Sequence, residues 1–132
     1  MTDCIFCKII KKEIPAEIID EDKETISFLD INPVNPGHTL VIPKEHHRMM
    51  GETPDNIIIA VFTKAKKIKR QIKRATQADY VAVSVIGLDV PHFHVHLIPR
   101  YVNDGLAKFW PTKKYKGNEE KKIARKIREQ KI

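Results

Sequence analysis

The chain contains 132 residues, of which 42% are hydrophobic and 31% are charged, a composition typical of one globular domain. It has no run of about 18 apolar residues, the length that crosses a bilayer, and its first residues lack the features of a secretory signal, so we expect a cytoplasmic protein without a membrane partner. The net charge of +7 is concentrated near the C-terminus, because residues 113–132 hold nine lysines and arginines against three glutamates.

The first half of the chain predicts a short helix and three strands. Residues 3–10 suit a short helix capped by Asp3. Its inward-facing residues are Ile5, Phe6, Ile9 and Ile10. Strands are predicted over residues 17–20, 25–30 and 38–43. The intervening segment INPVNPG (31–37) is rich in proline, asparagine and glycine and predicts a loop.

The second half predicts a long helix and two more strands. Thr53 caps a helix that Pro54 opens and that runs to about Ala75. Its apolar residues recur at helical spacing: Ile57, Ile58, Val61, Phe62, Ala65, Ile68 and Ile72. Residues 80–86 are nearly all apolar, which favours the centre of a sheet. Residues 92–98 form the next strand, and the short connection favours antiparallel pairing.

These elements predict an α+β fold, with an antiparallel sheet of about five strands, one long helix packed on it and a short N-terminal helix. The domain is expected to span residues 1–112, followed by a basic helical extension over residues 113–132. Such an extension can bind nucleic acid, but it is more often a solvated helix face. A nucleic-acid partner is therefore considered but not favoured.

The segment PHFHVHLIPR (91–100) alternates three histidines with three apolar residues. Because successive side chains on a strand point to opposite faces, His92, His94 and His96 are expected on one face. Two functions compete for them. They can ligate a metal, as in three-histidine zinc sites, or they can handle a phosphoryl group, because neutral imidazole is a nucleophile and its conjugate acid a proton donor.

Cys4 and Cys7 form a Cys-x-x-Cys motif close to the N-terminus. This spacing favours a metal clip or a redox motif over a structural disulfide, and the redox interpretation lacks a preceding core strand. Zinc would need further ligands, and His46, His47 and the triad are available. Two buried thiols without a metal remain the simpler alternative.

PHFHVHLIPR resembles the His-x-His-x-His motif of the histidine triad (HIT) family of nucleotide hydrolases and transferases. CIFCKIIKKEIPAEIIDED resembles the N-terminal segment of that family, and FLDINPVNPGHTLVIPKEH its central strand pair, so the resemblance covers residues 3–101. It implies a catalytic group of four histidines: His38, His92, His94 and His96. Within it, His94 would attack the α-phosphate, His96 would contact the leaving group, and His38 would hold a tautomer by a hydrogen bond.

The resemblance also implies a nucleotide site and a metal site. Asp30 would accept hydrogen bonds from the ribose hydroxyls. An apolar pocket for a purine base would be formed by Phe6, Ile9, Ile14, Phe28 and Ile31. A structural zinc ion, known in a subset of the family, would be held by Cys4, Cys7, His46 and His92, with His47 as the competing third ligand. The family is usually a homodimer joined through the long helix and a sheet strand.

One segment departs from the family pattern. Before the triad, most members carry a longer glycine-rich turn with an amide and a hydroxyl residue, whereas this chain has GLDVP, which places Leu88 and Asp89 there. A carboxylate that faces a phosphate is repulsive unless it turns away or is protonated. The departure leaves substrate identity more open than reaction type.

The function expected from these observations is that of an enzyme. It would cleave the α-phosphate bond of a purine nucleotide derivative through a covalent nucleotidyl-histidine, with a phosphoramidate, an aminoacyl adenylate or a dinucleoside polyphosphate as substrate. The alternative is a non-catalytic nucleotide-binding or interaction module stabilised by zinc. A third interpretation, a metallohydrolase with the triad as ligands, has no nearby aspartate ligand to support it.

Overall fold

A computed structural model describes residues 3–132, which form an α+β fold around one antiparallel sheet. The strands are β1 (Ile18–Glu21), β2 (Thr25–Leu29), β3 (Thr39–Pro43), β4 (Tyr80–Ser84) and β5 (Val95–Arg100). Their order in the sheet is β1-β2-β3-β5-β4, and every neighbouring pair is antiparallel. The predicted sheet of about five antiparallel strands is confirmed.

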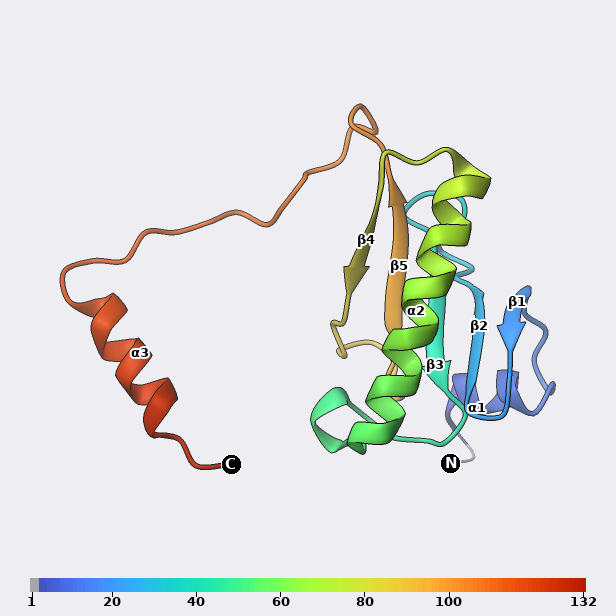
Figure 1. The fold of residues 1–132 in the computed structure, drawn as a ribbon, viewed down its shortest axis with the longest axis horizontal. Coiled ribbons are helices and arrows are strands. Elements are labelled where there is room, and N and C mark those ends of the chain that lie inside the picture. The colour runs from blue at the N-terminus through green and yellow to red at the C-terminus, as the bar shows by residue number, and fades with distance from the viewer. Residues whose placement is uncertain (1–2) are drawn as a thin grey trace.

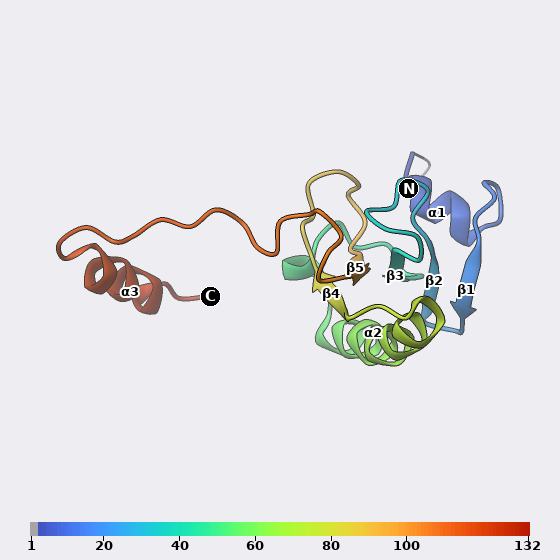
Figure 2. The same ribbon diagram turned by 90° about the horizontal axis from the view of Figure 1, so that it is seen from above.

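Helices lie on both faces of this sheet. They are α1 (Ile5–Ile10), α2 (Asp55–Thr76) and α3 (Glu119–Glu129), and a 3-10 turn, η1, spans Met50–Glu52. The long helix α2 covers one face and α1 lies against the other (Figure 1 and Figure 2). The sequence predicted both helices but not that they lie on opposite faces. Within residues 3–132, no helix combines the length and the apolar character needed to cross a membrane.

The sheet divides the core into two apolar clusters. The α2 cluster joins the inner face of α2 to β3, β4 and β5, and it contains Val41, Ile57, Val61, Ala65, Ile68, Ile72, Val81, Phe93, Val95 and Leu97. The α1 cluster, on the opposite face, contains Cys4, Phe6, Cys7, Ile9, Ile26, Phe28, Leu40 and Ile42. The predicted apolar stripe of α2 is confirmed, because five of its seven residues are buried and Ile58 and Phe62 pack against them.

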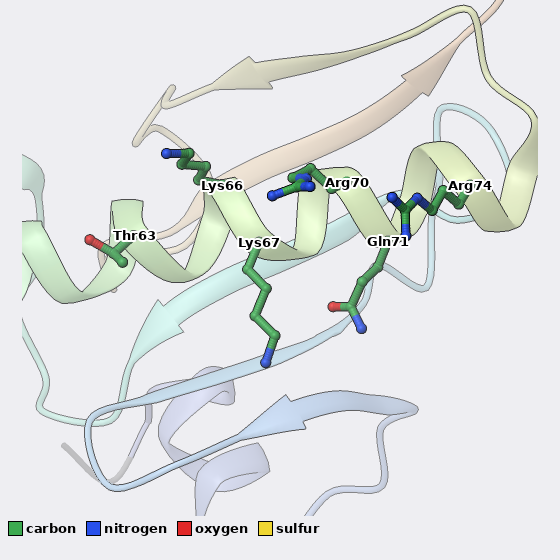
Figure 3. Close-up of a pocket in the computed structure, with 6 residues that line it drawn as sticks. All are labelled: Thr63, Lys66, Lys67, Arg70, Gln71 and Arg74. Atoms are coloured by element: carbon green, nitrogen blue, oxygen red, sulfur yellow. The ribbon is translucent and has the colours of Figure 1, made fainter.

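The outer face of α2 is basic. Lys66, Lys67, Arg70 and Arg74 line a shallow groove along this face together with Thr63 and Gln71 (Figure 3). These four cations are exposed, as expected for a solvated helix face. Lys64 differs, since its ammonium lies 2.6 Å from Asp20 and 2.9 Å from Asp22 and ties α2 to the β1–β2 hairpin.

Both helix starts differ from the predicted caps. The N-cap of α1 is Cys4 rather than Asp3, and its sulfur accepts a hydrogen bond from the N–H of Cys7. The N-cap of α2 is Pro54 rather than Thr53. The Thr53 hydroxyl donates to the carbonyl of Met49 at 2.8 Å, so it does not cap the helix. Ile5, predicted to face inward, is exposed at the rim of a pocket.

The prediction that residues 80–86 form a central strand is wrong. β4 ends at Ser84 and lies at the edge of the sheet, where it pairs with β5 alone. Val83, Val85 and Ile86 are exposed. The predicted antiparallel pairing of this strand with the next is confirmed. An apolar strand at a sheet edge offers unpaired backbone groups to another chain.

The chain after Tyr101 first stays beside the sheet, since Asp104 pairs with Arg100 of β5 at 2.6 Å and residues 107–110 line a pocket with side chains of β4 and β5. It then runs in an extended path to α3, which stands apart from the rest of the molecule in both views (Figure 1 and Figure 2). No residue of α3 is buried, and Ile123 and Ile127 are exposed. The predicted charged helix is present, but it covers only residues 119–129 of the predicted extension over residues 113–132. We propose that residues 1–112 form the domain and residues 113–132 its extension.

Candidate active site and metal centre

The histidines of the triad segment and its apolar residues lie on opposite faces of the sheet. Phe93, Val95 and Leu97 belong to the α2 cluster. The histidines lie on the α1 side, where the ring of Phe6 stands edge-on to His92 and His94 at centroid distances of 5.9 and 5.1 Å. All three imidazoles are buried. Because burial of an unpartnered polar group costs free energy, a ring nitrogen that is buried without a partner calls for an explanation.

The strand that carries the triad begins later than predicted, at Val95 instead of His92. Val95 pairs with Val41 of β3, and the ladder stops there. Upstream, the N–H of Phe93 donates to the carbonyl of His47 at 2.7 Å, so the backbone bonds to the loop after β3. Only His96 is therefore part of β5, while His92 and His94 lie in the segment that leads into it.

His92 belongs to a cluster with Cys4, Cys7 and His46, in which one ligand atom from each residue lies within 4.8 Å of the others. His92 Nδ1 is 3.4 Å from Cys4 Sγ and 3.2 Å from His46 Nδ1, and Cys7 Sγ is 3.3 Å from His46 Nδ1. His47, the competing ligand, points instead to Glu45 at 3.2 Å. Thus α1, the loop after β3 and the triad segment meet at one point.

The four groups fit a tetrahedral zinc ion. Bonds of about 2.3 Å to sulfur and 2.0–2.1 Å to nitrogen separate neighbouring ligand atoms by about 3.3–3.8 Å, close to the observed distances. The Nε2–H of His92 donates to the Pro43 carbonyl at 2.8 Å, which leaves Nδ1 unprotonated toward the cluster, as a metal ligand requires. Burial lowers the pKa of His92 to about 4. With four protein ligands the site would be closed and structural.

His94 presents an unprotonated nitrogen to a pocket. Its Nδ1 lies 2.7 Å from the carbonyl oxygen of His92. A carbonyl only accepts, so Nδ1 carries the proton and Nε2 carries the lone pair. His94 Nε2 is buried and has no hydrogen-bond partner within the described part of the chain. A buried imidazole held in this tautomer has the geometry of a nucleophile.

His96 has the opposite tautomer, fixed by a hydrogen-bond relay. The N–H of Val34 donates to His38 Nδ1 at 3.0 Å, so His38 carries its proton on Nε2. That nitrogen lies 2.9 Å from His96 Nδ1, and His96 is therefore protonated on Nε2. Burial lowers the pKa values of both imidazoles, against the opposing charge of Asp30. His96 thus offers an N–H donor beside the lone pair of His94, with ring centroids 4.9 Å apart.

The loop over residues 31–37 positions this relay. Gly37, with a φ of 101°, lies immediately before His38, and a Cβ there would stand 3.0 Å from Thr76 Cγ2. Only glycine fits such a backbone without strain. The side-chain amide of Asn35 donates to the Pro99 carbonyl at 2.9 Å, which fastens the loop to the end of β5.

A pocket of about 220 Å³ opens in front of His94 and His96. All six residues predicted for nucleotide recognition line it: Phe6, Ile9, Ile14, Phe28, Asp30 and Ile31. Asp30 lies beside the hydrogen-bond relay, with its Oδ2 3.6 Å from His38 Nε2, and its Oδ1 accepts the N–H of Asn32 at 2.9 Å. Ile31 is 82% exposed. The lining is therefore mainly apolar, with carboxylates and imidazoles as its ionisable groups.

The triad histidines do not share a metal ion in this arrangement. Among residues 3–132, His92 groups with Cys4, Cys7 and His46, and His96 groups with Asp30 and His38. The His38–His96 distance of 2.9 Å is that of a hydrogen bond. The three-histidine metal site is thus not formed. Asp89 was singled out in the sequence without an assigned role, and its Oδ1 lies 3.6 Å from His94 Nε2.

Comparisons with known proteins identify the family of this chain. The family model of the HIT domain matches residues 11–103. An uncharacterized HIT-like protein of Methanocaldococcus jannaschii is 44% identical, over 83% of this chain and 89% of its own. The adenosine 5'-monophosphoramidase of Saccharomyces cerevisiae is 39% identical, over 83% and 70%. An adenylylsulfatase of Arabidopsis thaliana is 38% identical, over 79% and 55%.

Two solved structures have the same fold as this chain. A HIT family member from Bacillus subtilis is 36% identical, covers 98% of both chains and has a TM-score of 0.88. A zinc-bound histidine triad protein from Mycobacterium smegmatis is 30% identical, covers 85% of both chains and has a TM-score of 0.77. With a family model that matches most of its length and relatives of this identity, the chain belongs to the histidine triad (HIT) family.

Proposed function

We propose that this protein is a hydrolase or transferase that cleaves nucleotide derivatives at the α-phosphate. The observation that carries the proposal is the pair of opposite tautomers: an unprotonated Nε2 on His94 and a protonated Nε2 on His96, both at the pocket. Neither a pure binding module nor a structural core needs this arrangement. Relatives named as an adenosine 5'-monophosphoramidase and an adenylylsulfatase support the same reaction type.

The reaction would proceed in two steps. His94 Nε2 attacks the α-phosphorus and the bond from phosphorus to the leaving group breaks, while the N–H of His96 Nε2 donates a hydrogen bond to the leaving atom, which takes its proton from solvent. Water then attacks phosphorus, the phosphorus–nitrogen bond breaks, and the nucleoside monophosphate leaves. The proton of the attacking water passes to solvent, and His94 regains its lone pair. Asp30 would bind the ribose hydroxyls with its second oxygen, and the apolar side chains that line the pocket would hold the base.

Zinc would be held by Cys4, Cys7, His46 and His92, and its chemistry would be structural. The metal would fix α1 against the triad segment, and α1 supplies Phe6 and Ile9 to the pocket. None of the two steps uses the metal. Chelation should therefore reduce activity only as far as it reduces folding.

The test is a comparison of the wild type with His94→Asn. Asparagine can keep the hydrogen bond to the His92 carbonyl but has no group at the position of Nε2. We expect AMP release from adenosine phosphoramidate to fall by at least about 1,000-fold. A covalent adenylyl adduct, sought by mass spectrometry without acid quenching, should disappear, while AMP binding persists. AMP binding without turnover in either protein would favour the non-catalytic nucleotide-binding module.

A further inference from the structure

The carboxylate of Asp89 lies at the reacting end of the pocket. Asp89 belongs to the short turn before the triad, its Oδ1 is 3.6 Å from His94 Nε2, and its side chain is 69% exposed. It lines the same pocket as His94 and His96. A substrate phosphoryl group that approaches His94 therefore comes within a few ångströms of this carboxylate, in this side-chain position or in a neighbouring rotamer.

The charges around the pocket do not compensate for Asp89. The pocket lining, within residues 3–132, includes two carboxylates, Asp30 and Asp89, but no lysine or arginine. Burial opposes ionisation of Asp89, yet backbone N–H groups of Asp89 and Val90 and the nearby imidazoles lower its pKa. The group is thus ionised near neutral pH. Sites that bind sulfate or polyphosphate groups normally supply cations for them.

We propose that Asp89 makes this site select substrates by charge, so that it favours an α-phosphate joined to an amine over one joined to sulfate or to further phosphates. The inference rests on the proposed function and names its substrate class. In a nucleoside phosphoramidate the phosphorus–nitrogen bond breaks and the leaving nitrogen takes a proton from solvent, so the amine leaves without negative charge. A sulfate or polyphosphate leaving group brings additional negative charge into a pocket that already holds two carboxylates.

The experiment uses Asp89→Asn, which removes the charge and keeps the shape. The ratio of kcat/KM for adenosine 5'-phosphosulfate to kcat/KM for adenosine phosphoramidate should rise at least tenfold, equivalent to about 1.4 kcal/mol. In the wild type this ratio should also rise with added salt, because salt screens the repulsion, and in the variant it should not. Glu24→Gln is the matched control, since Glu24 is an exposed acid outside the pocket, and it should leave the ratio unchanged.

Equilibrium binding separates this inference from the proposed function. Asp89→Asn should tighten the binding of AMP, a dianion, at least tenfold relative to that of adenosine, which is uncharged. Such a change in binding would support charge selection even if the protein turned over neither substrate. The absence of turnover would refute only the proposed reaction. The selective role of Asp89 would be overturned if Asp89→Asn changed neither the ratio of kcat/KM values nor the affinity for AMP relative to adenosine. An equal rise in kcat/KM for both substrates would overturn it as well.

Discussion

At the scale of single residues, the function depends on which nitrogen of each imidazole carries the proton. The tautomer of His94 is fixed by one backbone carbonyl, and the tautomer of His96 is fixed by a hydrogen-bond relay that begins at the N–H of Val34. Neutral imidazoles serve both roles, since a protonated His94 cannot attack phosphorus. The downward shifts of the pKa values of His38 and His96, caused first by burial, keep these two rings neutral.

The same shifts predict how stability depends on pH. Between the lowered folded pKa values and the unfolded value of about 6.5, the unfolded chain binds more protons than the native state. The contribution of these imidazoles to the free energy of unfolding therefore grows as pH rises through this window, and it is lost as pH falls below about 6.5. We expect His38→Gln to weaken this dependence, because glutamine can still donate to His96 but does not titrate.

Urea denaturation at several pH values between 5 and 8 would measure this effect. The variant should show a smaller loss of stability on acidification than the wild type. A stability profile with the same slope in both proteins would show that His38 contributes no proton uptake on unfolding.

At the scale of elements, α1 depends on contacts with the rest of the fold for its stability. It spans six residues, too few for a stable isolated helix. Its position depends on the apolar contacts of Phe6 and Ile9 and on the cluster that joins Cys4 and Cys7 to His46 and His92. Because α1 also lines the pocket, the metal site and the nucleotide site are expected to be coupled through this helix.

Removal of one cluster thiol should reveal that coupling. In Cys4→Ser, serine can still cap α1, so a decrease in stability would reflect the loss of the metal and not the loss of the cap. We predict a fall in zinc content from one ion per chain to a small fraction, and a decrease in Tm of about 10 °C, which is several kcal/mol for a domain of this size.

Metal analysis and calorimetry would measure these changes, with His47→Gln as the control, because His47 lies outside the cluster. Full retention of zinc and of Tm in Cys4→Ser would reject the assigned ligands. Loss of zinc in His47→Gln would instead identify His47 as the third ligand.

At the scale of the whole molecule, one edge of the sheet is apolar and open. Tyr80 and Val83 of β4 are exposed, as are Val85 and Ile86 after it, and Ile59 is 64% exposed on α2. β4 has no strand on its outer side within the described residues. Apolar exposure of this kind marks an interaction surface, and we propose that it joins two copies of the chain into a homodimer.

A charge on that edge should separate the dimer. Val83→Lys is expected to sediment as a monomer at micromolar concentration, whereas the wild type and Val83→Thr sediment as dimers, since threonine keeps the strand preference without the charge. Sedimentation velocity would measure the states, and circular dichroism would check that the fold is intact. A wild type that is only monomeric would remove the homodimer from consideration.

Much of this architecture follows from local sequence patterns. The apolar stripe of α2 has helical spacing, and the position of the histidines on the face opposite Phe93, Val95 and Leu97 follows from alternation. The position of β4 was not predictable in this way, because its apolar run extends past the strand into exposed residues. The predicted cap of α2 was wrong for a related reason. The hydroxyl of Thr53 donates to the carbonyl of Met49, a contact that residue preferences for helix caps do not predict.

The sequence predicts that three histidines share one face, and it contains a Cys-x-x-Cys motif upstream of them. Long-range contacts place His92 with the cysteines, whereas His94 and His96 face the pocket. The physical reason is that an imidazole acquires its role from the partner of each nitrogen. Those partners, the carbonyl of Pro43 for His92 and the ring of His38 for His96, are 49 and 58 residues distant in the chain.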